Sequence, residues 1–325
     1  MGKTLLLVSD LEEDRAFAAE VAITAGLTLQ TAATPEAGVK ILATENADIV
    51  FVDGSDEAKY QAFESVVQRE IGLFSDKLLN SNQFHFLTDE GPENAPFLLA
   101  SPLFGNLIMR NFGRVQDSGP HYGRLVKASL SDKIFGLNRL LSPTAKVQAV
   151  PLKSTHQKQE AVDAVKNYLL AAHFQGRIAT TIANSVDELL MNAMFDAPVD
   201  EVGQTLYSKT DRSTVMKLEG KSGVEMHVGY DGQFVAICVV DNWGSLDKGK
   251  LLQHISKLYK NEEYKVKSSI AGAGIGLASV FHAGGSLIFA SENRVKTEVT
   301  VLYRRTDSYK SFRDQFRFMM TQIYF

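Results

Sequence analysis

Short apolar runs alternate with stretches of helical periodicity over about the first 115 residues. The apolar runs lie at 4–8, 28–32, 47–53, 84–88 and 105–109, and the helical patterns lie at about 11–26 and 35–45. Continuously apolar strands that alternate with helices are typical of a parallel sheet with helices on both faces. The pattern therefore predicts a doubly wound, flavodoxin-like α/β domain over residues 1–115.

After about residue 146 the order of the patterns changes. Helical periodicity occupies about 156–172 and 176–195, and strand patterns lie near 147–152, 213–219, 224–230, 233–241, 285–290 and 297–303. The sequence Tyr230-Asp231-Gly232 is typical of a hairpin turn and predicts that the strands on either side of it are antiparallel. Helices followed by such strands predict a second α/β domain over residues 146–308.

Two segments fall outside these domains. The Gly-, Ser- and Pro-bearing stretch 113–122 predicts a domain boundary, and the apolar stripe from Leu125 to Leu141 predicts a linker helix within residues 116–145. That helix would pack between the domains or form the seam of a homodimer. The tail 309–325 is so apolar that it must dock on its own chain or on a partner.

Composition narrows the classes of function. With 325 residues, 45% of them hydrophobic, the chain is long enough for two globular domains. A net charge of −4 carries no polyelectrolyte signature, so nucleic acid is not an expected partner. The single cysteine, Cys238, lies in an apolar run and predicts a core residue, which favours a reducing cytoplasm. The first apolar run is too short for a signal peptide or a membrane span, so no membrane association is expected.

Three segments carry residues suited to a nucleotide site. Glu188 and Asn192 stand at i and i+4 on a predicted helix, where they can hold a general base and a metal on one face. Asp241 ends an apolar strand, where a buried carboxylate can accept a hydrogen bond from an exocyclic amine. Glycines at alternate positions predict a close approach of backbone to phosphate at a helix start. These glycines are Gly272, Gly274 and Gly276.

In this order, the three segments resemble the ATP-binding domain shared by gyrase-type topoisomerases, heat-shock chaperones, sensor histidine kinases and mismatch-repair ATPases (the GHKL superfamily). The nearest resemblance is to the anti-sigma-factor serine kinases, whose motif Glu-x-x-x-Asn-Ala is matched by Glu188 and Asn192-Ala193. The resemblance covers about residues 146–305. It implies ATP and Mg²⁺ as cofactors, with Asn192 on the Mg²⁺, Glu188 activating a Ser or Thr hydroxyl and Asp241 selecting adenine. The three glycines would shape a phosphate lid, and the partner would be a sigma-like or anti-anti-sigma-like regulator.

The later motifs depart from the family pattern. The adenine motif Asp-x-Gly-x-Gly reads Asp241-Asn-Trp243-Gly244-Ser245, with one glycine displaced to Gly244. Trp243 can stack on a base, an interaction worth about 1–3 kcal/mol, or it can fill the pocket. The last motif, Gly-Thr, keeps only Thr297.

These departures leave a second class of function open, a non-catalytic module that binds a regulator through protein contacts. A histidine kinase is disfavoured, because such an enzyme needs its phosphoacceptor on a long helical hairpin. His156 starts a single predicted helix, and His121 lies in a predicted loop.

Residues 1–115 resemble a response-regulator receiver domain. Asp10 and Asp53 follow the first and third strands, so both should lie at the carboxyl edge of the sheet. The resemblance implies that Asp53 is the phosphoacceptor position, that Asp10 helps to bind Mg²⁺ and that Thr88 is the usual hydroxyl. The usual lysine is missing, however, and Arg110 is the nearest cation. Since arginine is not a conservative replacement there, we predict a pseudo-receiver that acts through contacts.

Overall fold

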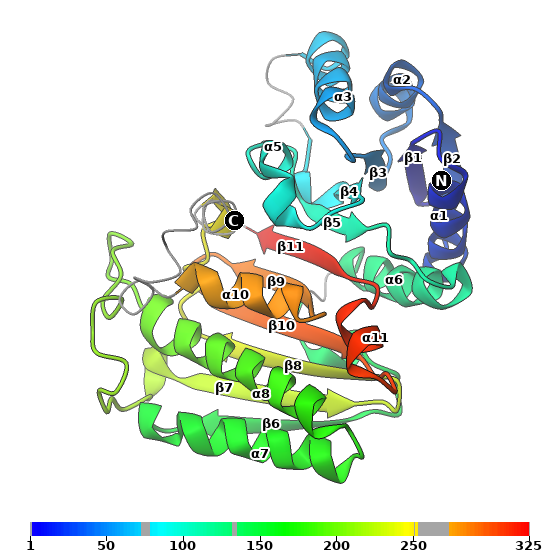
Figure 1. Cartoon of the computed structure of the whole chain (residues 1–325). Helices are drawn as coiled ribbons and strands as arrows, with labels where there is room; N and C mark the ends of the chain where they lie inside the picture. The colour runs from blue at the N-terminus through cyan, green and yellow to red at the C-terminus, as the bar shows by residue number, and fades with distance from the viewer. Residues whose placement is uncertain (1, 73–78, 132–134, 250, 253–272, 325) are drawn as a thin grey trace. The chain divides into compact units, whose positions relative to one another are not determined.

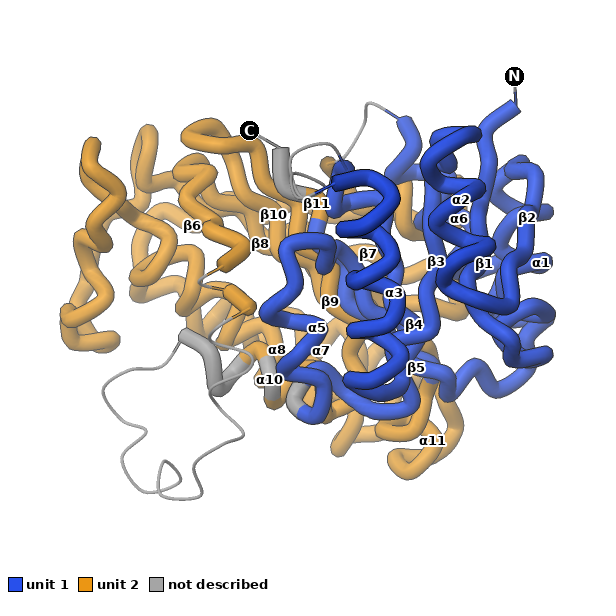
Figure 2. Tube along the Cα trace, turned by 90° about the horizontal axis from the view of Figure 1, so that it is seen from above, with its two compact units in different colours: residues 1–134, 316–321 blue, residues 135–315, 322–325 orange. Residues whose placement is uncertain are grey.

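The computed structural model describes residues 2–72, 79–131, 135–249, 251–252 and 273–324. The chain folds into two compact units, coloured separately in Figure 2. Unit 1 comprises residues 1–134 and 316–321, and unit 2 comprises residues 135–315 and 322–325. Both units are mixed α/β, as the sequence predicted.

Unit 1 contains a parallel sheet with the strand order β2-β1-β3-β4-β5. Its strands are β1 (Thr4–Val8), β2 (Thr28–Ala32), β3 (Ile49–Asp53), β4 (Phe84–Thr88) and β5 (Asn106–Met109). All five predicted strands are present. The residues of β3, β4 and β5 are buried throughout, which explains why their sequences are continuously apolar rather than alternating.

The helices of unit 1 form two packed pairs, α1 with α6 and α2 with α3. They are α1 (Glu12–Ala25), α2 (Pro35–Glu45), α3 (Glu57–Glu70), the short α5 (Pro96–Leu99) and α6 (Val115–Ser129). Gly26 ends α1 in the left-handed conformation at φ 74°. The Thr34 and Asp56 side chains cap α2 and α3 through the backbone N–H groups of Ala37 and Lys59.

The predicted boundary at 113–122 and the predicted linker helix are placed differently by the structure. Residues 115–129 form α6, which packs along α1 inside unit 1. A Cβ atom on Gly119 would lie 2.4 Å from Glu20 Cβ, and one on Gly123 would lie 2.7 Å from Thr24 Cβ. The glycines are therefore small residues at a close helix–helix contact, which composition alone does not distinguish from a loop.

The apolar tail docks on its own chain. It forms α11 (Tyr309–Arg313) and β11 (Phe318–Tyr324), and Phe318–Met320 pair antiparallel with β5. The Phe17 ring stacks on Phe112 at 4.2 Å and lies 5.6 Å from Phe316. The tail thus completes the aromatic core of unit 1.

Unit 2 is built on an antiparallel sheet with helices on one face (Figure 1). The strand order is β6-β7-β8-β10-β9, with β6 (Lys146–Leu152), β7 (Val224–Tyr230), β8 (Phe234–Asp241), β10 (Lys296–Arg304) and β9 (Ser286–Glu292). The helices are α7 (Lys158–Ala171), α8 (Gly176–Met191) and α10 (Ala273–His282). The predicted strand at 213–219 is wrong, because that segment makes only an isolated bridge between Ser154 and Lys217.

Strand β8 lies in the middle of this sheet and is buried along its whole length. Its last residue, Asp241, stands opposite Val224 of β7 and Thr297 of β10. Cys238 is fully buried within the strand, as predicted for a core residue. None of the helices that the structure describes is both long and apolar enough to cross a bilayer.

Candidate functional site

The end of α8 carries the predicted catalytic pair. Asn192 follows the last α-helical residue and begins a π-helical turn, Asn192–Asp196, of the kind that often marks functional positions. Its side chain hydrogen-bonds the Glu188 carboxylate. Burial raises the pKa of Glu188 to about 7, with a smaller contribution from the negative charges of Asp196 and Asp187. A carboxyl group with that pKa can exchange a proton at neutral pH.

A residue that the sequence analysis did not single out lies beside this pair. Arg212, on the loop after the π turn, donates from Nη2 to both carboxylate oxygens of Asp196, at 3.1 and 3.2 Å. Its guanidinium lies 5.0 Å from the ring centre of Phe195 and is close enough to Glu188 to lower that group's pKa. Asp196 is therefore neutralised by an arginine. An arginine in a turn-rich loop, remote in sequence from its partner, gave no periodic signal that could have identified it.

Asp241 is the second predicted element of the site. It is 4% exposed, and its carboxylate accepts hydrogen bonds from the backbone N–H groups of Trp243, at 2.9 Å, and of Gly244. Burial raises the pKa of this carboxyl to about 7 in spite of these two bonds. Strand β8 contacts both α8 and the π turn, so Glu188 and Asp241 lie on elements that pack against each other. Carboxyl groups with strongly raised pKa values are typical of functional sites.

Gly244 has a structural cause that the motif comparison did not reveal. Its φ is 56°, and a Cβ atom there would lie 2.1 Å from the carbonyl oxygen of Glu292. The Gly244 carbonyl accepts from the backbone N–H of Arg294, and the neighbouring Ser245 hydroxyl donates to the Ala197 carbonyl at 2.6 Å. The displaced glycine therefore lets the chain after β8 lie against the β9–β10 turn.

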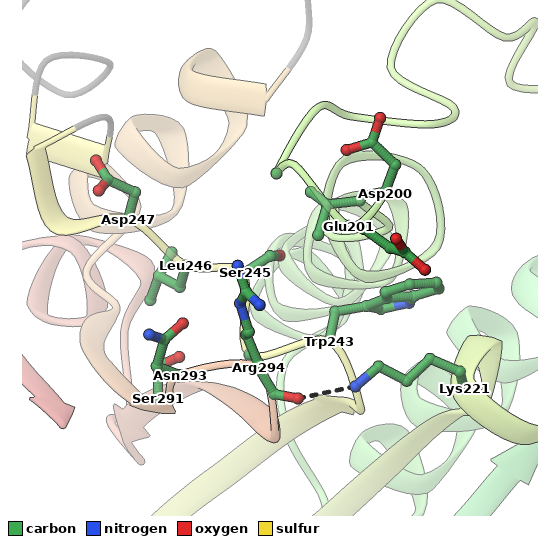
Figure 3. A pocket seen from close by; sticks show the side chains of 13 residues that line it. Asp200, Glu201, Lys221, Trp243, Ser245, Leu246, Asp247, Ser291, Asn293 and Arg294 are labelled. Atoms are coloured by element: carbon green, nitrogen blue, oxygen red, sulfur yellow. Dashed lines mark hydrogen bonds between the residues drawn. The ribbon is translucent and has the colours of Figure 1, made fainter. Parts of the chain in front are cut away.

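A pocket of about 770 Å³ opens beside this segment (Figure 3). Trp243 and Lys221 lie on one side of it and Asp247 on the opposite side. The Lys221 ammonium lies 5.7 Å from the Trp243 ring centre and donates to the Arg294 carbonyl at 2.9 Å. The indole Nε1 of Trp243 is buried and has no hydrogen-bond partner among the described residues. The charged groups of the lining are mixed in sign, with the acids Asp200, Glu201 and Asp247 and the cations Lys221 and Arg294. The flat aromatic wall of Trp243 suits a planar ligand.

The remaining predicted nucleotide residues are only partly described. Helix α10 is described from Ala273 onward, and Gly274 and Gly276 lie within it. Gly272 lies outside the described residues. Thr297 is buried opposite Asp241, and its hydroxyl lies 3.3 Å from that of the pocket residue Ser291.

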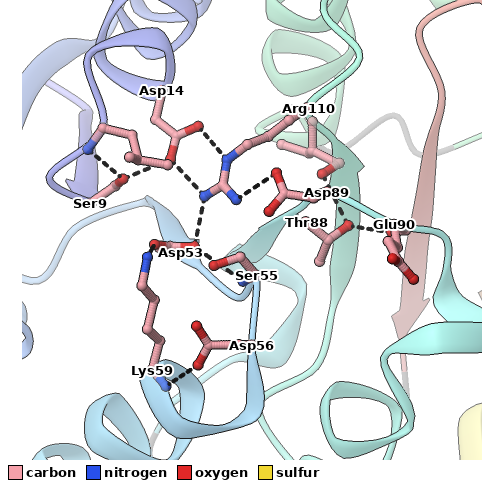
Figure 4. A network of polar contacts seen from close by, with 12 residues as sticks. Ser9, Asp14, Asp53, Ser55, Asp56, Lys59, Thr88, Asp89, Glu90 and Arg110 are labelled. Carbon is pink, nitrogen blue, oxygen red and sulfur yellow. Dashed lines mark hydrogen bonds and ion pairs between the residues drawn. The ribbon is translucent and has the colours of Figure 1, made fainter.

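Unit 1 contains a separate polar network at the carboxyl edge of its parallel strands (Figure 4). Arg110, just beyond β5, donates from Nε and Nη2 to Asp14, from Nη2 to Asp53 at 2.7 Å and from Nη1 to Asp89 at 3.2 Å. Lys59 donates to the other oxygen of Asp53 at 2.6 Å. Although burial of Asp53 opposes ionisation, the bonds from Arg110 and Lys59 hold its pKa at about 2.

The residues predicted for receiver-like chemistry are distributed unevenly around this network. Asp53 lies at its centre, but Asp10 is exposed, and the buried acid of the first loop and helix is Asp14. The Thr88 hydroxyl donates to the Glu90 carbonyl at 2.8 Å. Asp14 was missed because an acid in the first turn of a helix usually indicates a helix start rather than a buried ion pair. Among the described residues, no group of three or more His, Cys, Asp or Glu is arranged to hold a metal ion.

Comparison of the sequence with models of known protein families finds no match, and comparison with curated proteins finds no relative.

Proposed function

We propose that unit 2 binds ATP with Mg²⁺ and that the chain is a signalling protein that transfers phosphate to a Ser or Thr of a partner regulator. The observation that carries the proposal is the position of Glu188 and Asn192 on elements packed against β8, the strand that ends in Asp241. The pocket at Trp243 and the position of Gly274 and Gly276 within α10 add support. In this proposal unit 2 has a histidine-kinase-like α/β sandwich fold, nearest to the anti-sigma-factor kinases.

The residues present fit such a ligand. The side-chain amide oxygen of Asn192 is a ligand of the kind that Mg²⁺ takes, and Glu188 beside it can accept a proton. Two buried donors, Trp243 Nε1 and Arg212 Nη1, have no acceptor among the described residues, as expected for groups that serve a ligand. Bound ATP would supply the phosphoryl group.

Each side chain then has one task. Asn192 would hold the Mg²⁺, and Glu188 would take the proton of the attacking hydroxyl, for which a pKa of about 7 is suitable. Asp241 would accept from the exocyclic amine of adenine, which guanine lacks at that position. Trp243 would stack on the base.

Unit 1 is proposed to be a pseudo-receiver that regulates unit 2 through contacts. Its β2-β1-β3-β4-β5 order is the flavodoxin-like order found in receiver domains, and it supports that fold. Arg110 and Lys59 contact both oxygens of Asp53, which places two cations where a receiver would bind Mg²⁺ and accept a phosphoryl group.

A non-catalytic binding module is the second candidate, and one observation favours it. The Asp241 carboxylate accepts hydrogen bonds from the backbone N–H groups of Trp243 and Gly244, so it has hydrogen-bond partners in the absence of a nucleobase. A histidine kinase is disfavoured, because His156 lies in a single short turn, Thr155–Gln157, and His121 lies within α6.

The testing experiment is a calorimetric titration of the whole protein with ATP and with GTP, each with and without Mg²⁺. The proposal expects Mg²⁺-dependent binding that favours ATP and is weakened in Asn192→Ala. Asn184→Ala, an exposed asparagine on the same helix, is the matched control and should bind as the unmodified protein does. No nucleotide binding, or equal affinity for ATP and GTP, contradicts the assignment.

A further inference from the structure

One nitrogen of the Arg212 guanidinium, Nη1, has no hydrogen-bond acceptor among the described residues. Nη2 makes both bonds to Asp196, whereas Nη1 is buried and has no partner among the described residues. A buried donor of a charged group that has no acceptor destabilises the protein. Such an arrangement persists where the donor meets a ligand that the protein alone does not provide.

The position of Arg212 indicates which ligand this is. The guanidinium lies over the Phe195 ring and within electrostatic reach of Glu188, the proposed base. Both oxygens of its neighbour Asp196 are already engaged. The unpaired Nη1 of the charged guanidinium can donate charge-assisted hydrogen bonds to the oxygens of a phosphate, a group that arginine commonly binds.

We infer that Arg212 is the residue by which unit 2 distinguishes a nucleoside triphosphate from a diphosphate, through contact of its guanidinium with the terminal phosphate. The inference rests on the proposed function, because it assigns a further residue to the same site. Asp196, which accepts from Nη2 of the same guanidinium, competes with the phosphate for it. In phosphoryl transfer an arginine so placed also neutralises charge on the group transferred.

The test compares the affinities of a non-hydrolysable ATP analogue and of ADP, both with Mg²⁺, in three variants of the whole protein. Arg212→Met should lower affinity for the ATP analogue about 10- to 100-fold and for ADP less than about twofold, the range for one charged hydrogen-bonding group. Asp196→Asn should raise affinity for the ATP analogue, because it removes the competing carboxylate. Arg177→Met is the matched control, since Arg177 lies 3.8 Å over the Tyr309 ring but is exposed at the start of α8.

Each outcome has one meaning. Loss confined to the ATP analogue in Arg212→Met, together with a gain in Asp196→Asn, supports the inference. Equal loss for both nucleotides, or no loss for either, overturns it and leaves nucleotide binding standing. If Arg212→Met fails to fold, Arg212→Lys takes its place, because it keeps the charge and removes the fork, and the same ratio of affinities is measured. Failure of the unmodified protein to bind either nucleotide overturns the proposed function and this inference with it.

Discussion

Arg110 donates from Nε and Nη2 to the two carboxylate oxygens of Asp14, at 2.9 Å in each case, and the Asp14 side chain is fully buried. The Ser9 hydroxyl donates to the same carboxylate at 2.6 Å. A buried carboxylate is tolerated only when a cation and hydrogen bonds satisfy it. Arg110 is thus a structural counter-ion as well as the partner of Asp53.

Removal of this guanidinium should destabilise unit 1 strongly. Arg110→Met leaves the Asp14 carboxylate buried without its cation, and we expect a loss of about 3–5 kcal/mol in the free energy of unfolding. Urea unfolding followed by circular dichroism measures it. The double variant Asp14→Leu, Arg110→Met should recover part of the loss, and the exposed Arg69→Met should change little. An effect of Arg110→Met no larger than that of Arg69→Met would contradict the assignment.

Asp53 should not accept phosphate efficiently from small donors. Arg110 contacts one of its oxygens and Lys59 the other, so whichever oxygen attacks a phosphoryl group must first leave an ion pair. Intact-mass spectrometry after incubation with acetyl phosphate and Mg²⁺ is expected to show no added phosphoryl group. A stoichiometric adduct that is absent from Asp53→Asn would refute the pseudo-receiver.

Asp241 should make the stability of the protein depend on pH. Burial raises the pKa of the Asp241 carboxyl from its ordinary value of 3.8 to about 7, so between these pH values the folded protein binds a proton that the unfolded chain has released. This contribution therefore lowers the free energy of unfolding as pH rises from about 4 to about 7. Asp241→Asn cannot ionise and should be more stable than the unmodified protein at pH 8, by on the order of 2–4 kcal/mol.

The same substitution should weaken ATP binding, because an amide nitrogen in place of an oxygen cannot accept from adenine. Urea unfolding at pH 5 and pH 8 measures the stability, and calorimetry measures the affinity. The exposed Asp307→Asn is the control for both. If Asp241→Asn is no more stable than the unmodified protein at pH 8, then ionisation of Asp241 does not destabilise the folded state.

Glu188→Gln should separate catalysis from binding. The amide keeps the shape of the carboxyl group but takes no proton, so transfer from ATP to a partner should fall about 10²–10⁴-fold while ATP affinity stays nearly constant. In the unmodified protein the transfer rate should rise with pH through about 7, the pKa of Glu188. Undiminished transfer by the variant would assign Glu188 a structural role.

Gly244→Ala should disrupt the loop beside the pocket. The new Cβ would lie 2.1 Å from the Glu292 carbonyl oxygen, at a φ of 56°. Gly232 is the matched control, since its φ is 92° but no atom lies within 4 Å of a Cβ there. Gly232→Ala is expected to cost about 1–2 kcal/mol from backbone strain alone, and Gly244→Ala more. Equal losses in the free energy of unfolding, measured with urea, would show that the β9–β10 turn moves to accommodate the new Cβ atom at no cost.

The sequence by itself determines where most strands and helices lie. Runs such as 4–8, 84–88 and 105–109 are apolar because both faces of a parallel strand are buried, so the pattern is a direct consequence of position in the sheet. The same holds for α8, whose inward residues repeat at helical spacing. Glu188 and Asn192 were identified because a separation of four residues places them on one face of a helix. Asp241 was identified because it ends an apolar strand.

The tertiary structure alone decided which distant residues meet. Nothing local distinguishes Asp14 from other acids of a first helical turn, and its partner Arg110 lies on another element of the fold. Gly119 and Gly123 lie in a stretch whose composition is typical of a loop. Their role becomes visible only where α6 packs closely against α1. The position of Arg212 beside Glu188 likewise results from the packing of distant segments. The periodicity of apolar residues in the sequence indicates which face of an element is buried. The partner of a buried charge, by contrast, depends on how the elements pack in three dimensions.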